Sequence, residues 1–205
     1  MERRDFLAAT VASGFLAGFP SATLADQSEP GEHLLPFYLP PATEPLLPGP
    51  QGIGIRTRVR QRQTNGQYSS VEFVVGPKIM GPAPHLHEAL DELMYVLEGT
   101  VSVLVGEEVF QVQAGGWHLR PRGIVHTFWN ATDQTVRAID MYFQQPFEDY
   151  LEAVFHTLPR EAQAKGLSMD APEIRARHRA LTEQFGMKGF PEKRQALVEK
   201  YGLRG

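Results

Sequence analysis

The sequence predicts an all-β fold, a single β-barrel or sandwich, with an extended N-terminal arm and a helical C-terminal extension. Between residues 53 and 143, apolar side chains alternate with polar ones in short runs that glycine-rich turns separate. No helical pattern interrupts these runs, which argues against alternating strands and helices. From residue 147 the apolar period becomes that of a helix. The 205 residues suffice for one such domain with appended segments.

The composition excludes several classes of function. Hydrophobic residues make up 42% of the chain and charged residues 21%, which is typical of a globular protein. The net charge is −4 without a long basic block, so we expect neither nucleic acid nor an anionic membrane as a partner. The chain has no cysteine, which excludes disulfides, thiolate metal sites and thiol nucleophiles.

Residues 1–25 have the pattern of a targeting segment. Arg3 and Arg4 precede an uncharged run from Phe6 to Phe19, which is too short to cross a bilayer. The paired arginines followed by Phe-Leu resemble a twin-arginine export signal, and residues 23–25 offer a cleavage site. We therefore expect an exported, periplasmic protein; the alternative is an N-terminal helix that packs on the fold.

Residues 26–52 contain seven prolines between short apolar pieces. Proline disfavours both helices and central strands. The segment is too apolar for a free linker, since Phe37 and Tyr38 are among its residues. We expect an extended arm that lies on the domain or on a neighbouring subunit.

Residues 53–146 form the predicted β-domain. Asn65-Gly66 is typical of a two-residue hairpin turn between its first two strands. The expected strands are 53–59, 70–75, 93–97, 100–105, 108–113, 124–129 and 135–143.

Residues 147–205 form the predicted helical extension. An apolar stripe starts at Phe147, and Pro159 is expected to end that helix. A second helix is expected from Pro172 to Gly186 and a third from Pro191 to Tyr201. We expect these helices to pack on the outside of the β-domain.

Three histidines and one carboxylate are the candidate metal ligands. His85 and His87 are two residues apart, so in a strand both imidazoles point to the same face, and Glu92 follows closely. His126 on a later strand can join them if the sheet curls. Imidazole and carboxylate ligands suit a divalent first-row metal, and four protein ligands leave coordination positions open for a substrate.

Two spaced motifs carry these residues. The first reads H-x-H-x4-E-x6-G from His85 to Gly99, and the second reads G-x5-P-x-G-x2-H-x3-N from Gly115 to Asn130. Together they resemble the paired motifs of the cupin superfamily over roughly residues 70–145. The resemblance implies a single jelly-roll barrel that binds one metal ion, which could be Fe, Mn, Ni, Cu or Zn.

Two positions depart from the usual cupin pattern. Gly81 is separated from His85 by only three residues, and Gly116 stands where the family often has aspartate. Neither position is a ligand, so the resemblance still implies a complete metal site.

The resemblance leaves three functions open. The first is a metal-dependent dioxygenase of the quercetinase-like kind, acting on a small aromatic or phenolic compound, in which Glu92 serves as the catalytic base. The second is a non-oxidative metalloenzyme of the decarboxylase or isomerase type. The third is a module that binds a metal or ligand without turnover.

Other candidate residues have weaker support. His118 either faces the cavity or packs near Trp117, and Tyr142 is expected mainly in the core. Asp91 and Glu88 are expected to be solvated or to support the ligands, whereas His33, His156 and His178 are not expected to be ligands. Outward-facing apolar residues of the strands need a cover, which predicts a homodimer.

Overall fold

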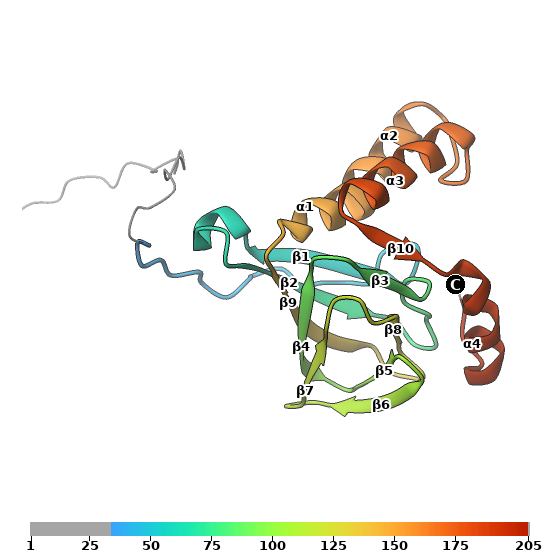
Figure 1. Cartoon of the computed structure of the whole chain (residues 1–205), viewed down its shortest axis with the longest axis horizontal. Helices are drawn as coiled ribbons and strands as arrows, with labels where there is room; N and C mark the ends of the chain where they lie inside the picture. The colour runs from blue at the N-terminus through green and yellow to red at the C-terminus, as the bar shows by residue number, and fades with distance from the viewer. Residues whose placement is uncertain (1–33, 205) are drawn as a thin grey trace, which may run out of the picture.

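The computed structural model describes residues 34–204 and has two antiparallel five-stranded sheets that face each other (Figure 1). The targeting segment and His33 lie outside the described residues. In spatial order, the first sheet contains β1 (Ile53–Val59), β2 (Tyr68–Val75), β9 (Val136–Phe143), β4 (Asp91–Glu98) and β7 (Trp117–Arg120). The second contains β10 (Met187–Gly189), β3 (His85–His87), β8 (His126–Trp129), β5 (Thr100–Val105) and β6 (Glu108–Gln113). The prediction of an all-β domain is confirmed.

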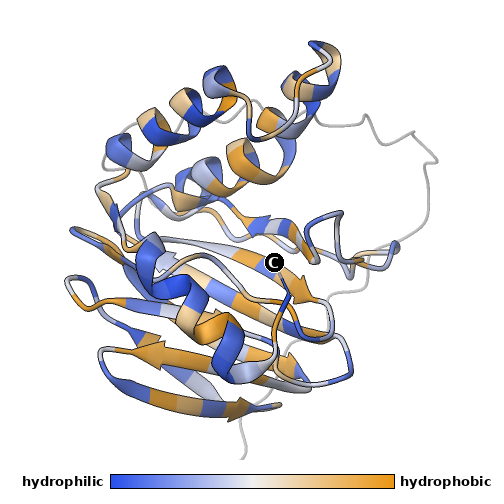
Figure 2. Cartoon of the chain, turned by 90° about the vertical axis from the view of Figure 1, so that its right-hand side faces the viewer, coloured by the Kyte–Doolittle hydropathy of each residue, from blue (hydrophilic) through white to orange (hydrophobic). Residues whose placement is uncertain are grey.

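The main core lies between the two sheets, where apolar strand residues gather (Figure 2). Strand β4 shows the alternation that builds it: Glu92, Met94 and Val96 are buried, whereas Leu93 and Tyr95 between them are only partly buried. The inner side chains of β2, β5 and β9 complete this core. The alternation therefore places Glu92 on the inner face, at one end of an otherwise apolar row.

The connection between β1 and β2 differs from the predicted two-residue turn. It spans residues 60–67 and contains a 3₁₀ helix, Gln61–Thr64. Asn65 and Gly66 follow this helix with φ values of 49° and 77°, so both have the left-handed backbone that the sequence suggested. The backbone N–H of Gln61 donates to Glu148 Oε1 at 2.8 Å. This contact with the helical extension stabilises the longer loop. The residues around position 65 do not predict the contact, because its acceptor lies far away in the sequence.

The helical extension contains α1 (Phe147–Glu152), a π-helical turn (Ala153–Thr157), α2 (Leu158–Ala164), α3 (Pro172–Gln184), a 3₁₀ helix (Pro191–Lys193) and α4 (Arg194–Tyr201). The prediction that Pro159 ends the first helix is wrong. The π-helical turn shifts the hydrogen bonding just before Pro159, which then stands in the first turn of α2, where its missing N–H costs little. Among residues 34–204, no helix is long and apolar enough to cross a membrane.

The extension covers the β-domain at two places (Figure 1). Helix α4 packs against the outer face of β8, where Trp129 is fully buried with its ring centroid 4.7 Å from that of Tyr201. The outward-facing Trp129 is thus covered by the chain itself. Helix α1 follows β9 directly and packs Phe147 and Tyr150 into the main core.

Candidate metal centre

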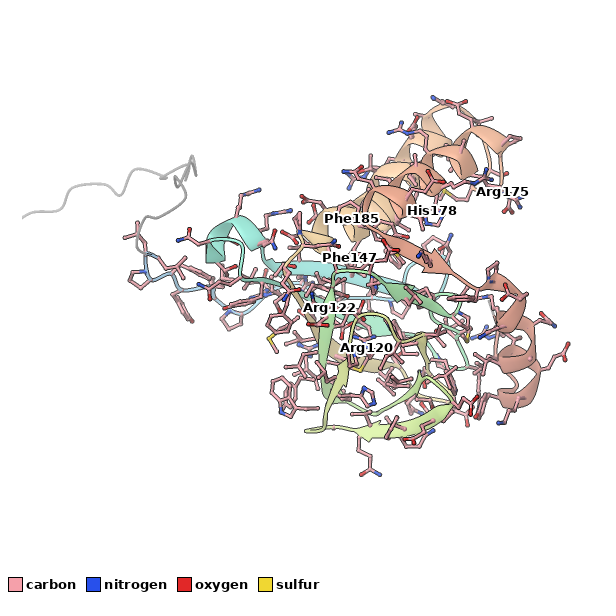
Figure 3. The ribbon with its side chains drawn as sticks, viewed as in Figure 1. Arg120, Arg122, Phe147, Arg175, His178 and Phe185 are labelled. Carbon is pink, nitrogen blue, oxygen red and sulfur yellow. The ribbon has the colours of Figure 1, made fainter. Side chains whose placement is uncertain are left out.

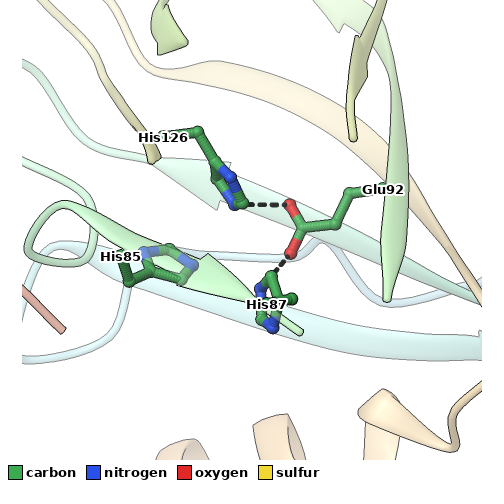
Figure 4. Close-up of side chains that lie close together, drawn as sticks. All are labelled: His85, His87, Glu92 and His126. Atoms are coloured by element: carbon green, nitrogen blue, oxygen red, sulfur yellow. Dashed lines mark ion pairs between the residues drawn. The ribbon is translucent and has the colours of Figure 1, made fainter. Parts of the chain in front are cut away.

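The four predicted ligands converge at one end of the space between the sheets (Figure 4). His85 and His87 share one face of β3, and the register of β3 with β8 places His126 directly opposite His85. Glu92 reaches the same point from β4 in the other sheet. The four residues are buried, and one candidate ligand atom from each lies within 4.8 Å of the other three. The sequence thus identified four side chains that the fold brings together.

Two backbone carbonyls orient the histidines. His85 Nδ1 is 2.9 Å from the oxygen of Ala83, and His126 Nδ1 is 3.0 Å from the oxygen of Ile124. A carbonyl oxygen can only accept, so each Nδ1 carries the proton and each Nε2 presents a lone pair. This is the arrangement in which a metal-bound imidazole is usually held.

The inner nitrogens lack hydrogen-bond partners, which fits a metal site. Neither ring nitrogen of His87 has such a partner, nor does Nε2 of His126. His87 Nε2 lies 2.8 Å from Glu92 Oε1, and His126 Nε2 lies 3.5 Å from Glu92 Oε2, but neither contact has hydrogen-bond geometry. Buried polar atoms left in this state are costly unless something binds them. A divalent first-row metal with nitrogen and oxygen ligands would satisfy them.

A buried charge network holds Glu92 from behind. Arg120 Nη2 is 3.1 Å from Glu92 Oε2 and also contacts Asp140 Oδ1. The other oxygen of that carboxylate, Asp140 Oδ2, accepts a hydrogen bond of 3.2 Å from the Tyr142 hydroxyl. The strand register explains this grouping, because β4 pairs Glu92 with Arg120 on one side and with Tyr142 on the other. One cation therefore faces two carboxylates, and all three side chains are almost fully buried.

The network sets the charge of the ligands. Burial opposes ionisation of Glu92, but Arg120 and His126 outweigh it and hold the pKa of Glu92 well below its usual value. Burial dominates at Asp140 and raises its pKa despite the same arginine. Burial, helped by His126, lowers the pKa of His85 to about 3, so its ring is neutral and able to bind a metal at neutral pH.

A cavity of about 520 Å³ opens beside the four ligands. His85 and Glu92 are part of its wall, which is otherwise mainly apolar and rich in aromatic side chains. The aromatic wall residues come from both the β-domain and the extension: Phe73, Phe128, Tyr142, Phe147, Tyr150 and Phe155.

The expectation that the extension packs on the outside of the β-domain holds for α4 but is incomplete, because α1 and β10 reach the site. Strand β10 pairs with β3, and Met187 lies opposite His87. The ring of Phe147 stands edge-on to His87, with the centroids 4.9 Å apart. Figure 3 shows Phe147 between the sheets and the segment of α3 and the residue after it that carries His178 and Phe185. The extension thus forms part of the site and supports the strand that carries two ligands.

The structure separates the weaker candidates. His118 is half-buried against the ring of Phe110 and is not one of the four clustered ligands. Asp91 forms a surface ion pair with Arg122, as Glu88 does with Lys188. These two carboxylates support neighbouring strands and do not enter the site.

Three further residues named from the sequence have clear positions. Tyr142 lines the cavity and is also part of the core, and Asn130 is fully buried with its amide bound to backbone oxygens of Val75, Gly76 and Gln134. His178 lines the cavity and is 3.1 Å from the hydroxyl of Tyr150. It is therefore a wall residue outside the ligand cluster.

Sequence reasoning missed Arg120 and Asp140 as partners of Glu92. The sequence contained a signal for this pairing. Arg120 lies two residues after His118, so in a strand the two side chains point to the same face, and an arginine on the inner face of a sheet needs a carboxylate partner. Using it required recognising β7, which is only four residues long.

Comparison with known proteins agrees with this architecture. Residues 71–142 match the family model described as "Cupin domain". No curated protein matches the chain.

Many solved structures are similar to part of the chain. KdgF from Halomonas sp. is 19% identical, with a TM-score of 0.43, over 48% of this chain and 84% of that one. The polyketide cyclase RemF from Streptomyces resistomycificus is 26% identical, with a TM-score of 0.41, over 48% of this chain and 70% of that one. The oxalate decarboxylase of Lactobacillus farciminis is 20% identical, with a TM-score of 0.42, over 49% of this chain but only 31% of that one.

The segment that matches the cupin-domain model, residues 71–142, contains most of the strands of the two antiparallel sheets. Its buried group of three histidines and one glutamate is a candidate site for one metal ion.

Proposed function

We propose that this protein is a metal-dependent dioxygenase, similar to quercetinase-like cupins, that acts on a small aromatic or phenolic compound. The observation that carries the proposal is the position of the four ligands in the wall of a large aromatic cavity. Flat aromatic molecules pack well against such a wall. The volume of about 520 Å³ suits a compound of one to three rings.

A divalent first-row metal would supply Lewis acidity and, if it is redox-active, a partner for dioxygen. His85, His87, Glu92 and His126 would hold it. Phe128 and Phe147 exclude water from the reacting centre and orient the ring of the substrate.

Glu92 takes the proton of the phenol in this proposal. Arg120 makes Glu92 a weak base. A bound metal ion would supply Lewis acidity that makes a nearby phenol more acidic, and Glu92 would then be basic enough to accept its proton.

The test is metal analysis of the purified protein, followed by oxygen uptake with a panel of flavonols and catechols. We expect one first-row metal per chain and metal-dependent oxygen uptake with at least one compound. The His126→Ala variant should lose both, whereas His156→Ala, which changes a histidine outside the site, should retain both. Full metal occupancy in His126→Ala would refute the site.

Other outcomes would identify the two alternatives. Carbon dioxide release without oxygen uptake would indicate a non-oxidative metalloenzyme. Stoichiometric binding of a compound without any product would indicate a binding module.

We also propose that the protein is exported by the twin-arginine route and works in the periplasm. The support is the sequence of residues 1–25 alone. Replacing Arg3 and Arg4 with lysine should retain the protein in the cytosol, and mass spectrometry of the periplasmic form should show a start near residue 26. Unchanged export in the double variant would refute the route.

A homodimer is our proposal for the oligomeric state. Trp117 and Leu119 are 57% and 53% exposed on β7, next to the partly buried Leu93 and Tyr95 of β4. An apolar face of this kind is typically covered by another chain. Light scattering should give twice the chain mass, and Trp117→Glu should reduce it to the mass of a monomer.

A further inference from the structure

Two arginines line the cavity, and they have different surroundings. Arg120 is 1% exposed and lies between the carboxylates of Glu92 and Asp140, so protein groups already balance its charge. Arg194, the first residue of α4, has no ion pair with any of residues 34–204. Among the described residues, it is the arginine of the cavity wall whose charge has no partner.

The backbone around the cavity fixes the guanidinium of Arg194. Its Nη1 donates to the carbonyl oxygen of Gly81 at 2.7 Å, in the segment that leads to His85. Gly81 is itself fixed, because its N–H donates to the oxygen of Phe128, and a Cβ added there would lie 2.3 Å from that oxygen. The N–H of Phe190 donates to the oxygen of Pro84 and joins the start of α4 to the same segment. Arg194 is therefore held rigidly against the cavity wall.

The position of Arg194 is unfavourable for an unpaired cation. The side chain is half-buried, and burial lowers its pKa. Guanidinium nevertheless stays charged in proteins, and it has five N–H donors. The hydrogen bond to Gly81 uses one of them and neutralises no charge. An anion in the cavity would supply the missing partner.

We propose that Arg194 binds the carboxylate of the compound that occupies this cavity, so that the ligand is an aromatic acid rather than a neutral aromatic molecule. A carboxylate fits because one guanidinium can bind it through two parallel hydrogen bonds. A phosphate group carries about twice the charge, and the described wall has no second unpaired arginine or lysine for it. The inference rests on the proposed function only in taking the cavity as the binding site, and it does not depend on the reaction.

The test compares two ligands of the same shape that differ in charge, 2-naphthoate and its neutral amide 2-naphthamide. Isothermal titration calorimetry with the zinc-loaded protein gives both dissociation constants without turnover, since zinc has no redox chemistry. We expect 2-naphthoate to bind about 10- to 100-fold more tightly than 2-naphthamide, as for a charge-assisted hydrogen-bonded pair. Arg194→Gln should abolish most of that preference, and Arg194→Lys should retain part of it.

The amide also reports whether the variants fold, because its affinity should be unchanged in Arg194→Gln. Any affinity of the carboxylate for the metal is common to the wild-type protein and the variant. It therefore cancels when the preference for 2-naphthoate over 2-naphthamide is compared between the two proteins. Arg179→Gln, which changes an exposed arginine of α3, should keep the full preference.

A preference for 2-naphthoate that is as large in Arg194→Gln as in the wild-type protein would refute the inference, as would equal affinities or no binding of either ligand to the wild-type protein. Failure of the proposed function has a different signature, which is absent oxygen uptake with every phenolic compound. The two failures can therefore be distinguished.

Discussion

Replacing Arg120 with leucine tests whether a buried charge network holds Glu92, a candidate metal ligand. Arg120, Glu92 and Asp140 are 1%, 3% and 1% exposed, so water cannot compensate a charge that loses its partner. The variant leaves two carboxylates buried near each other without a cation. Burial already raises the pKa of Asp140 while the arginine is present, which shows how poorly this environment tolerates negative charge.

The expected loss is about 3–5 kcal/mol in the free energy of unfolding of the metal-free protein, the range for removing one partner of a buried ion pair. Domains are typically stable by about 5–15 kcal/mol, so this loss is a large fraction of the total. A metal ion on Glu92 would compensate one of the two carboxylates. We therefore expect the loss to be smaller when the protein is loaded with metal.

Urea unfolding at pH 7, followed by the fluorescence of Trp117 and Trp129, measures this difference. The matched control is Arg122→Leu, since Arg122 pairs with Asp91 on the surface and the two side chains are 39% and 29% exposed. An exposed pair of this kind contributes about 0–1 kcal/mol. If Arg120→Leu costs no more than Arg122→Leu, the carboxylates are not held as a buried charge network and the reasoning fails.

The remaining predictions concern pH, packing and a turn. Because the pKa of His85 falls from 6.5 to about 3 on folding, the unfolded chain binds the extra proton; stability from His85 is present above pH 6.5 and is lost as pH falls toward 3. The melting temperature of the metal-free protein should thus fall as the pH is lowered from 7 to 5, and it should fall less steeply in the His85→Gln variant. An equal dependence of melting temperature on pH in the two proteins would contradict this prediction. Phe147→Ala should cost about 3–5 kcal/mol in urea unfolding and weaken metal binding, whereas Phe110→Ala, at a 40% exposed position, should cost far less. Gly99→Ala should destabilise the protein more than Gly106→Ala. Both glycines have positive φ, so both substitutions strain the backbone. A Cβ at Gly99 would in addition lie 2.8 Å from a side chain of β9, whereas a Cβ at Gly106 would have no neighbour closer than 3.9 Å.

The ligands could be predicted from the sequence because local rules determine them. The i, i+2 spacing of His85 and His87 places both rings on one face of a strand, whatever its register with the neighbouring strands. The inner position of Glu92 follows from the apolar residues that alternate after it. His126 needed the second motif, and its position opposite His85 depends on pairing between β3 and β8. Strands of six to eight residues were recognised because the alternation repeats several times within them.

What the sequence did not reveal depends on pairing between short segments. Strands β7 and β10 have four and three residues, too few for a periodic pattern to stand out. Without β7, nothing places Arg120 beside Glu92. Without β10, nothing brings the chain after α3 onto β3, the strand that carries His85 and His87. The sequence therefore predicts the four candidate metal ligands and misses the charged groups around them that set their pKa values.

The two missed strands bear on the nature of the ligand. Strand β7 brings one arginine to two buried carboxylates, which leaves that network with one net negative charge. A divalent metal on Glu92 would turn this into one net positive charge, and Arg194, which follows β10, adds a second at the cavity wall. A phenolic acid that ionises at both groups carries two negative charges and balances them. A neutral phenol would leave the charge at Arg194 uncompensated, so the arrangement of charges favours the acid.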